Sequence, residues 1–220
     1  MPQKITLTAL IAVAAAIVGV MLVAAMRPAS EVAQSGAAVA GRTEGAPAGG
    51  RVTAPVALKA RKGRVLSVAD AVKELDLIRP SRQKLAEDFT LPLVGGDELR
   101  LSAQRGKVVL INFWATWCPP CREEMPAMDR LWRQQKDQGF VLVAVSVDAD
   151  TKTVKPFLDE HKLTFPAALD PRMDLANAYG VRALPSSFIV DRNGHLTALA
   201  LGPRAWDNDA AHSLIEGLLR

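Results

Sequence analysis

The sequence predicts a layered α/β domain with a mixed sheet in its C-terminal part, on three observations. A near-continuous apolar run over 108–114 is typical of a strand that is buried on both faces of a parallel sheet. From Arg122 onward the pattern becomes charged and helical, with apolar residues three and four apart. Beyond this point strand-like and helix-like segments alternate to the end of the chain, which is the pattern of an α/β domain.

The remaining elements of this domain follow from local signals. Before the central strand, two short apolar segments at 89–91 and 99–101 flank Gly95-Gly96, which predicts a small hairpin. After the central strand we expect helices over 119–138, 154–161 and 209–219, a turn or short helix over 173–179, and strands over 141–147, 187–190 and 195–201. Asp191-Arg192-Asn193-Gly194 is a turn signal that joins the last two strands.

The N-terminal segment contains 22 residues without a charge, from Ile5 to Met26, between Lys4 and Arg27. A helix of this length spans about 33 Å, enough to cross a hydrocarbon core of about 30 Å. The alternative is a cleaved signal peptide, whose apolar region usually has about 7 to 15 residues. We interpret residues 1–27 as an uncleaved signal anchor that forms one transmembrane helix.

Residues 28–84 predict a flexible tether before the main domain at 85–220. Its first part, 28–57, is rich in Ala, Gly and Pro and has no apolar periodicity. A short amphipathic helix is expected near 67–78, where Ser67 and Asp70 form a capping pattern and Pro80 would end the helix. We expect its apolar stripe to pack on the main domain or on itself rather than to bind a partner.

Charge argues against nucleic-acid binding. The basic surplus lies in residues 51–84, with 9 basic and 3 acidic residues, whereas residues 85–220 carry 15 and 18, a net charge of −3. A mildly acidic folded domain lacks the electrostatic footprint of a nucleic-acid-binding protein. The basic segment is interpreted as a solvated linker.

The chain has only two cysteines, Cys118 and Cys121, in a Cys-Pro-Pro-Cys motif between the central strand and the following helix. Such a short loop restrains little of the unfolded chain, so a catalytic pair is favoured over a structural disulfide. A zinc site is the alternative, but it lacks a second cysteine pair, and the histidines are scattered at His161, His195 and His212. Redox chemistry is therefore the preferred interpretation, with no metal and no cofactor beyond the Cys118–Cys121 disulfide.

The position of the motif suggests a role for each cysteine. Cys118 would direct its sulfur at the free amides and positive dipole end of the helix, so we predict an exposed nucleophile with a depressed pKa. Cys121, one turn later, would resolve the mixed disulfide. Pro119 and Pro120 remove two amide donors and stiffen the loop.

Four segments resemble one branch of the thioredoxin superfamily. They are FWATWCPPCREEMP, the preceding DFTLPLVGGDELRLSAQRGKVVLIN, and the later VLVAVSVD and YGVRALPSSFIVDRNG. The resemblance is to TlpA/ResA-like thiol-disulfide oxidoreductases, which are extracytoplasmic and often membrane-anchored, and it covers about residues 85–220. It implies a thioredoxin-like fold, in which helices flank a central mixed sheet, with an N-terminal hairpin and an insertion near 150–175.

The resemblance also assigns roles to further residues. Pro185 matches a cis-proline opposite the dithiol, which lets the backbone of Leu184 pair with an extended substrate; cis X-Pro bonds are otherwise uncommon, at about 5 to 6%. Glu124 matches an acidic residue that tunes thiol protonation, the alternative being a solvated carboxylate on the helix face. Asn112 stands where thioredoxins keep a buried acid, which leaves Glu124 as the candidate proton acceptor.

Two tryptophans bracket the motif. We expect core packing for both Trp114 and Trp117, with a place on the substrate surface as the alternative for Trp117. The expected substrate-binding set is Trp117, Pro119, Pro120, Leu184 and Pro185.

Together these features predict a single-pass protein of the bacterial inner membrane, with its catalytic domain in the periplasm or on the outer surface. It would reduce disulfides of specific client proteins, which the resemblance suggests are apocytochrome c or copper-site cysteines. A membrane thiol-electron donor is the expected second partner. The alternatives are a peroxiredoxin-like peroxide reductase, or a non-enzymatic copper-handling module in which Met125 or Met128 would assist the thiols.

Overall fold

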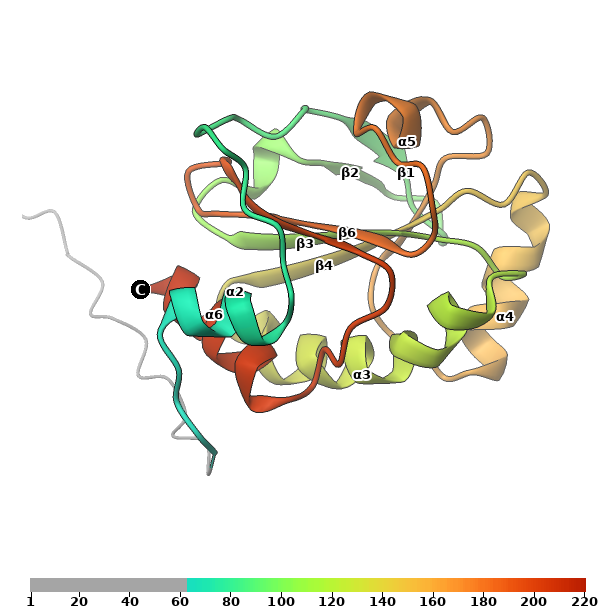
Figure 1. Cartoon of the computed structure of the whole chain (residues 1–220). Coiled ribbons are helices and arrows are strands. Elements are labelled where there is room, and N and C mark those ends of the chain that lie inside the picture. The colour runs from blue at the N-terminus through green and yellow to red at the C-terminus, as the bar shows by residue number, and fades with distance from the viewer. Residues whose placement is uncertain (1–62) are drawn as a thin grey trace, which may run out of the picture. The chain divides into compact units, whose positions relative to one another are not determined.

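A five-stranded mixed sheet forms the centre of the computed structural model, which describes residues 63–220 (Figure 1). The strand order is β5-β4-β3-β6-β7; β3, β4 and β5 run parallel, while β6 and β7 are antiparallel to their neighbours. The strands are β3 (Val108–Trp114), β4 (Phe140–Ser146), β5 (Ala167–Leu169), β6 (Ser186–Val190) and β7 (Leu196–Leu201). This mixed sheet confirms the predicted fold class; β5, a three-residue strand, was not predicted.

The central strand β3 organises the core. All seven of its residues are buried, as the apolar run predicted, and it pairs with β4 on one side and β6 on the other. The chain leaves β3 at Trp114 and enters α3 (Pro119–Gln135), the longest helix within residues 63–220, at Cys118. The dithiol therefore lies just beyond the carboxyl end of the fully buried central strand.

Helices cover both faces of the sheet. In Figure 1, α3, α6 (Asp209–Leu219) and α2 (Val68–Glu74) lie on one side, and α5 (Asp174–Ala178) lies on the other side with the hairpin. Helix α4 (Val154–Glu160) and strand β5 occupy the predicted insertion. Short 3-10 turns occur at Ser102–Gln104, Lys136–Gln138 and Thr151–Thr153.

The predicted hairpin is confirmed as a separate two-stranded sheet of β1 (Thr90–Pro92) and β2 (Glu98–Arg100). Its turn places Gly95 and Gly96 at φ values of 124° and 104°, which favour glycine. The segment between α2 and the hairpin runs beside β7, through antiparallel bridges of Ile78 with Leu199 and Leu85 with His195. After the first hairpin strand, Leu93 forms a similar bridge with Ala168 of β5.

Helix α2 begins as predicted but ends earlier. The Ser67 side chain accepts a hydrogen bond from the Asp70 amide at 3.1 Å, which confirms the cap. The helix stops at Glu74 rather than continuing toward Pro80, because Asp76 adopts a left-handed conformation with φ 50°. The predicted range 67–78 was therefore too long.

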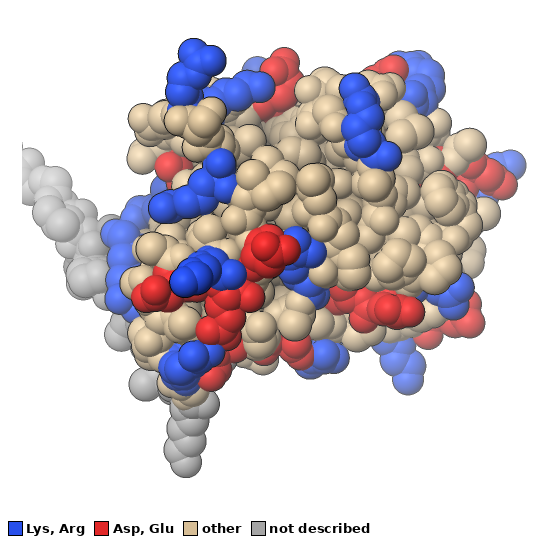
Figure 2. All heavy atoms as spheres, in the orientation of Figure 1, with Lys and Arg blue, Asp and Glu red and all other residues tan. Residues whose placement is uncertain are grey.

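Helix α2 packs against α6, so the folded body begins before residue 85. Gly217 of α6 makes room for this contact, because a Cβ there would lie 2.5 Å from Val68 Cγ2. Figure 2 shows basic and acidic side chains interspersed around this end of the molecule. This face consequently offers no extended field of one sign.

The predicted anchor, residues 1–27, lies outside the described residues. Within residues 63–220, no helix combines the length and hydropathy that crossing a bilayer requires.

Candidate active site

Both cysteines lie at the start of α3 and are joined by a disulfide, with Cα atoms 5.4 Å apart. Cys118 is the N-cap residue, and its sulfur accepts a hydrogen bond from the Cys121 amide at 3.3 Å. Pro119 and Pro120 occupy the first two helical positions and have no N–H, so the Cys121 amide is the first one available to the sulfur. The helix end therefore directs one amide donor at Cys118.

The two cysteines differ in burial less than we predicted. Cys118 is 4% exposed and Cys121 is fully buried, so Cys118 is the more accessible of the two residues but is not an exposed one. The expectation of an exposed nucleophile was wrong for this oxidised state, because the Cys118 sulfur is turned toward the helix end and bonded to Cys121.

A mostly apolar groove of about 380 Å³ opens beside Cys118. Its lining comes from the dithiol loop, the end of β4, the start of α5 and the segment that precedes β6. The lining residues are Trp117, Cys118, Pro119, Pro120, Val147, Met173, Val181, Arg182, Ala183 and Leu184. This groove can hold an extended apolar segment against the sulfur.

Glu124 lies one helical turn after Cys121 and is buried, with 4% exposure. Its Oε1 accepts a hydrogen bond from Asn112 Nδ2 at 2.9 Å, and its Oε2 accepts from the Trp206 Nε1 and the Arg204 backbone amide, both at 3.0 Å. Burial raises the pKa of Glu124 from 4.5 to about 7, and these hydrogen bonds oppose the rise. The alternative of a solvated carboxylate on the helix face is excluded.

Asn112 connects Glu124 to the neighbouring strand. It is fully buried on β3, and its Nδ2 also donates to Ser187 Oγ of β6 at 2.9 Å. The side-chain amide of Asn112 does not ionise. Among Asn112, Ser187 and Glu124, which these hydrogen bonds connect, Glu124 is therefore the ionisable group.

The sequence profile of the AhpC/TSA family matches residues 83–199. The chain belongs to the AhpC/TSA family.

Named relatives place this AhpC/TSA-family chain among ResA-like thiol-disulfide oxidoreductases of the thioredoxin superfamily. It is 40% identical over 127 residues to thiol-disulfide oxidoreductase ResA of Geobacillus kaustophilus, which is 58% of this chain and 73% of the relative. Identity to ResA of Halalkalibacterium halodurans is 36% over 117 residues, 53% of this chain and 66% of that protein.

A solved structure confirms the thioredoxin-like fold of this family member. A Chlorobium tepidum protein described as a candidate thiol:disulfide interchange protein, DsbE, superposes with a TM-score of 0.59 at 37% identity. The match covers 64% of this chain and 99% of that one. The chain is therefore a thiol-disulfide oxidoreductase whose Cys118–Cys121 pair is bonded as a redox-active disulfide requires.

The other residues expected from the resemblance take different positions in this ResA-like site. The Leu184–Pro185 peptide bond is cis, as predicted; Leu184 lines the groove, whereas Pro185 is buried. Trp114 is in the core, as expected. Core packing was the wrong expectation for Trp117, which is 67% exposed because it lies in the loop between β3 and α3, on the rim of the groove.

Sequence reasoning missed Asp148, which supports the loop that leads to Cys118. The buried Asp148 carboxylate accepts hydrogen bonds from the Thr116 amide at 3.0 and 3.2 Å and from Thr116 Oγ1 at 2.6 Å. Ser146 Oγ donates to the same carboxylate at 2.8 Å. An acidic residue directly after a buried strand was the available signal, since such positions meet the neighbouring strand end at one edge of a parallel sheet.

Replacing Asp148 with alanine should destabilise this ResA-like domain by about 2–4 kcal/mol, because it leaves the donors of Thr116 and Ser146 without a partner in a buried site. Urea unfolding of the oxidised protein measures the change. The matched control is Asp159→Ala, which removes an exposed ion pair with Lys155 and should change stability by less than about 1 kcal/mol. Equal losses in both variants would contradict the supporting role of Asp148.

Metal binding was the alternative role of the cysteine pair. No group of three or more His, Cys, Asp or Glu side chains within the described residues could hold a metal ion. Met125 and Met128, considered earlier as copper ligands, are buried in the core.

Proposed function

We propose that this thiol-disulfide oxidoreductase is a membrane-anchored, extracytoplasmic reductase of a restricted set of client proteins. The observation that carries the proposal is the apolar groove that leads to Cys118, together with the buried carboxyl group of Glu124 one helical turn after Cys121. A groove of this kind selects extended client segments, and the carboxyl group supplies proton handling at near-neutral pH.

The reaction begins with the reduced dithiol. The Cys118 thiolate attacks one sulfur of the client disulfide, so that a Cys118–client bond forms and the client's second sulfur leaves as a thiolate that takes up a proton. Cys121 then loses its proton and attacks Cys118 Sγ. The Cys118–Cys121 bond forms, the client's remaining sulfur leaves as a thiolate, and two electrons have passed to the client. The protein ends in the oxidised state of the structure.

Glu124 is proposed as the acceptor of the Cys121 proton. Glu124 is three positions after Cys121 on α3, so their side chains lie on the same face of the helix. With its pKa at about 7, the carboxyl group exists in both forms near neutral pH and can both take and return a proton. Cys118 stays in the nucleophilic role because the Cys121 amide and the helix dipole favour its thiolate.

Residues 1–27 would anchor the enzyme in the bacterial inner membrane, with the catalytic domain in the periplasm or on the outer surface. In an oxidising compartment a reductase needs electrons from elsewhere, so a membrane-embedded dithiol donor is the proposed second partner. Haem-attachment cysteines of apocytochrome c, or the cysteines of a copper site, are the proposed clients. The dithiol itself would be the redox group, without a metal or an organic cofactor.

Peroxide reduction is the less favoured activity. The two cysteines are bonded to each other at the start of one helix, and the relatives reported above are thiol-disulfide oxidoreductases by name.

Trp117→Ala should lower kcat/KM by about tenfold on a peptide with an oxidised Cys-x-x-Cys-His motif, because an exposed aromatic side chain on the groove rim is lost. Reduction of a small aromatic disulfide, which needs only the sulfur, should change by less than about twofold. Stopped-flow fluorescence with both substrates measures the two rates.

Trp132→Ala is the matched control, since Trp132 lies on α3 outside the residues that line the groove. It should leave the rates on both substrates unchanged. An equal loss on peptide and small disulfide in Trp117→Ala would show that this side chain does not contribute to client binding.

A further inference from the structure

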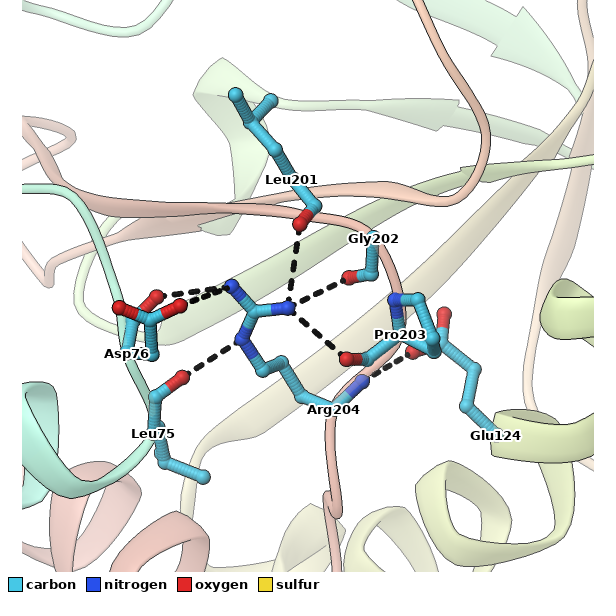
Figure 3. A network of polar contacts seen from close by, with 7 residues as sticks. All are labelled: Leu75, Asp76, Glu124, Leu201, Gly202, Pro203 and Arg204. Carbon is cyan, nitrogen blue, oxygen red and sulfur yellow. Dashed lines mark hydrogen bonds and ion pairs between the residues drawn. The ribbon is translucent and has the colours of Figure 1, made fainter.

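Arg204, in the loop after β7, ties that loop to the end of α2 (Figure 3). Its Nε donates to the Leu75 carbonyl at 2.7 Å, and its Nη2 donates to the Asp76 carbonyl at 2.9 Å and to Asp76 Oδ2 at 3.2 Å. A guanidinium at a helix C-terminus satisfies free carbonyl groups and interacts favourably with the helix dipole. Arg204 thus joins two segments that are 128 residues apart.

The same guanidinium also holds its own loop. Its Nη1 donates to three successive carbonyl groups, those of Leu201 at 3.1 Å, Gly202 at 3.3 Å and Pro203 at 2.9 Å. These contacts draw the loop around the guanidinium, where Gly202 adopts a φ of 84°. The Arg204 side chain is 17% exposed, so much of its charge is shielded from water.

This loop carries two of the three donors that bind Glu124. The Arg204 amide and the Trp206 side chain both donate to Oε2, whereas the third donor, Asn112, comes from β3. The position of both loop donors depends on the fold of the loop, and the fold of the loop depends on the Arg204 side chain and its contacts with α2. A continuous set of hydrogen bonds therefore runs from α2 to the buried carboxyl group (Figure 3).

We propose that Arg204 is the positioning residue through which α2 controls the protonation of Glu124. The proposal deepens the proposed function, because it rests on Glu124 being the proton acceptor of the dithiol. Helix α2 lies within residues 28–84, the segment that the sequence analysis interpreted as the tether. Displacement of α2 would reach the redox site by way of Arg204 and its hydrogen bonds.

The direction of the effect follows from the groups that face Glu124. Arg204 is the charged group that acts on it from the loop; Asn112 from β3 and Trp206 are neutral, and Cys121 precedes it on α3. The Arg204 charge and amide both lower the pKa of Glu124, against the larger effect of burial. Asp76, the acidic partner of Arg204, has a 97% exposed side chain and offsets little of that charge. Loss or displacement of Arg204 should therefore raise the pKa of Glu124 above about 7.

The first test is Arg204→Gln in the oxidised full-length chain in detergent, with ¹³C-labelled glutamate carboxyl groups followed by NMR. The Glu124 signal, assigned by its loss in Glu124→Gln, should titrate about one pH unit higher than in the wild type. Arg204→Lys, which keeps the charge but lacks the forked geometry, should give an intermediate midpoint. An unchanged midpoint in Arg204→Gln would overturn the proposal.

The second test moves α2 and leaves Arg204 in place. In Gly217→Ala the new Cβ would meet Val68 Cγ2 at 2.5 Å, which should push α2 away from α6. The midpoint of Glu124 should rise in this variant and return toward the wild-type value in the double variant Gly217→Ala/Val68→Ala, where the obstructing methyl group is gone. A wild-type midpoint in Gly217→Ala, together with a measured displacement of α2 in its amide chemical shifts, would contradict control by α2.

Neither titration depends on client reduction, so failures of the two proposals are distinguishable. If the midpoints shift as expected but Glu124→Gln reduces the client peptide at the wild-type rate across the pH range, the role of Glu124 in catalysis is wrong and the control of its protonation stands. If Glu124→Gln slows reduction but the Arg204 variants titrate like the wild type, the inference about Arg204 is wrong.

Discussion

Cys121→Ser should stop multiple turnover and accumulate a covalent complex between Cys118 and the client. The first attack is unaffected, because Cys118 keeps its place at the helix N-terminus with the residue-121 amide as donor. The second attack has no sulfur, so the mixed disulfide persists. Non-reducing electrophoresis of membranes from cells that express the full-length variant, followed by mass spectrometry of the reducible adduct, identifies the client. A haem-attachment or copper-site protein in the adduct would support the proposed client class.

Cys118→Ser is the matched control and should give no adduct, because Cys121 is fully buried and a client sulfur cannot reach it. Adducts that form in Cys118→Ser but not in Cys121→Ser would reverse the assigned roles. A set of adducts with many unrelated proteins would argue against a restricted client range.

Glu124→Gln should make the oxidised protein more stable than the wild type at alkaline pH, with little of this advantage at acidic pH. The pKa of Glu124 is about 7 in the folded protein against an ordinary value of 4.5, so folding favours the protonated form. This contribution to stability is fully present below about pH 4.5 and is lost as the pH rises through about 7. The loss is on the order of 3 kcal/mol, and glutamine, which does not ionise, avoids it.

Glutamine fits the same hydrogen-bond geometry. Its oxygen can accept from the Arg204 amide and Trp206, while its amide nitrogen faces Asn112, whose Oδ1 has no partner among the described residues. A turn of the Asn112 amide then lets this oxygen accept the new donor. Urea unfolding at several pH values measures the stability difference. A difference that does not grow between about pH 4.5 and 8 would show that burial does not raise the pKa of Glu124.

Elements with strong local patterns were predictable. The buried strand over 108–114 and the helix over 209–219 have the predicted bounds. The continuous apolar run of the strand and the amphipathic period of the helix can both be recognised from consecutive residues. The end of α2 was not predictable, since Asp76 takes the left-handed position of a Schellman motif, in which the Leu77 and Asp76 amides donate to the Val72 and Lys73 carbonyls, and glycine is the usual signal there. The strand β5 has three residues and follows Pro166, too short a run to show a period.

The residues of the site also divide into those that the sequence predicts and those that it does not. Cys118, Cys121 and the cis bond before Pro185 could be placed from motifs, because their chemistry depends on residues that are close in sequence or on a family pattern. Arg204 and Trp206 could not, since their contact with Glu124 joins residues 80 and 82 positions apart. Trp117 was misjudged because aromatic residues usually favour burial, whereas this one occupies a loop that projects beyond the sheet.

The bridges at Ile78, Leu85 and Leu93 have a consequence for self-association. These residues pair with β7, with His195 just before it, and with β5, the two outer strands of the main sheet being β7 and β5. Each border therefore already has partners for part of its backbone amides and carbonyls. An outer strand whose backbone amides and carbonyls have no partner lets two copies join strand to strand and begin aggregation. Covered borders limit such strand-to-strand association, and a fragment that started after residue 86 would lose the protection along β7.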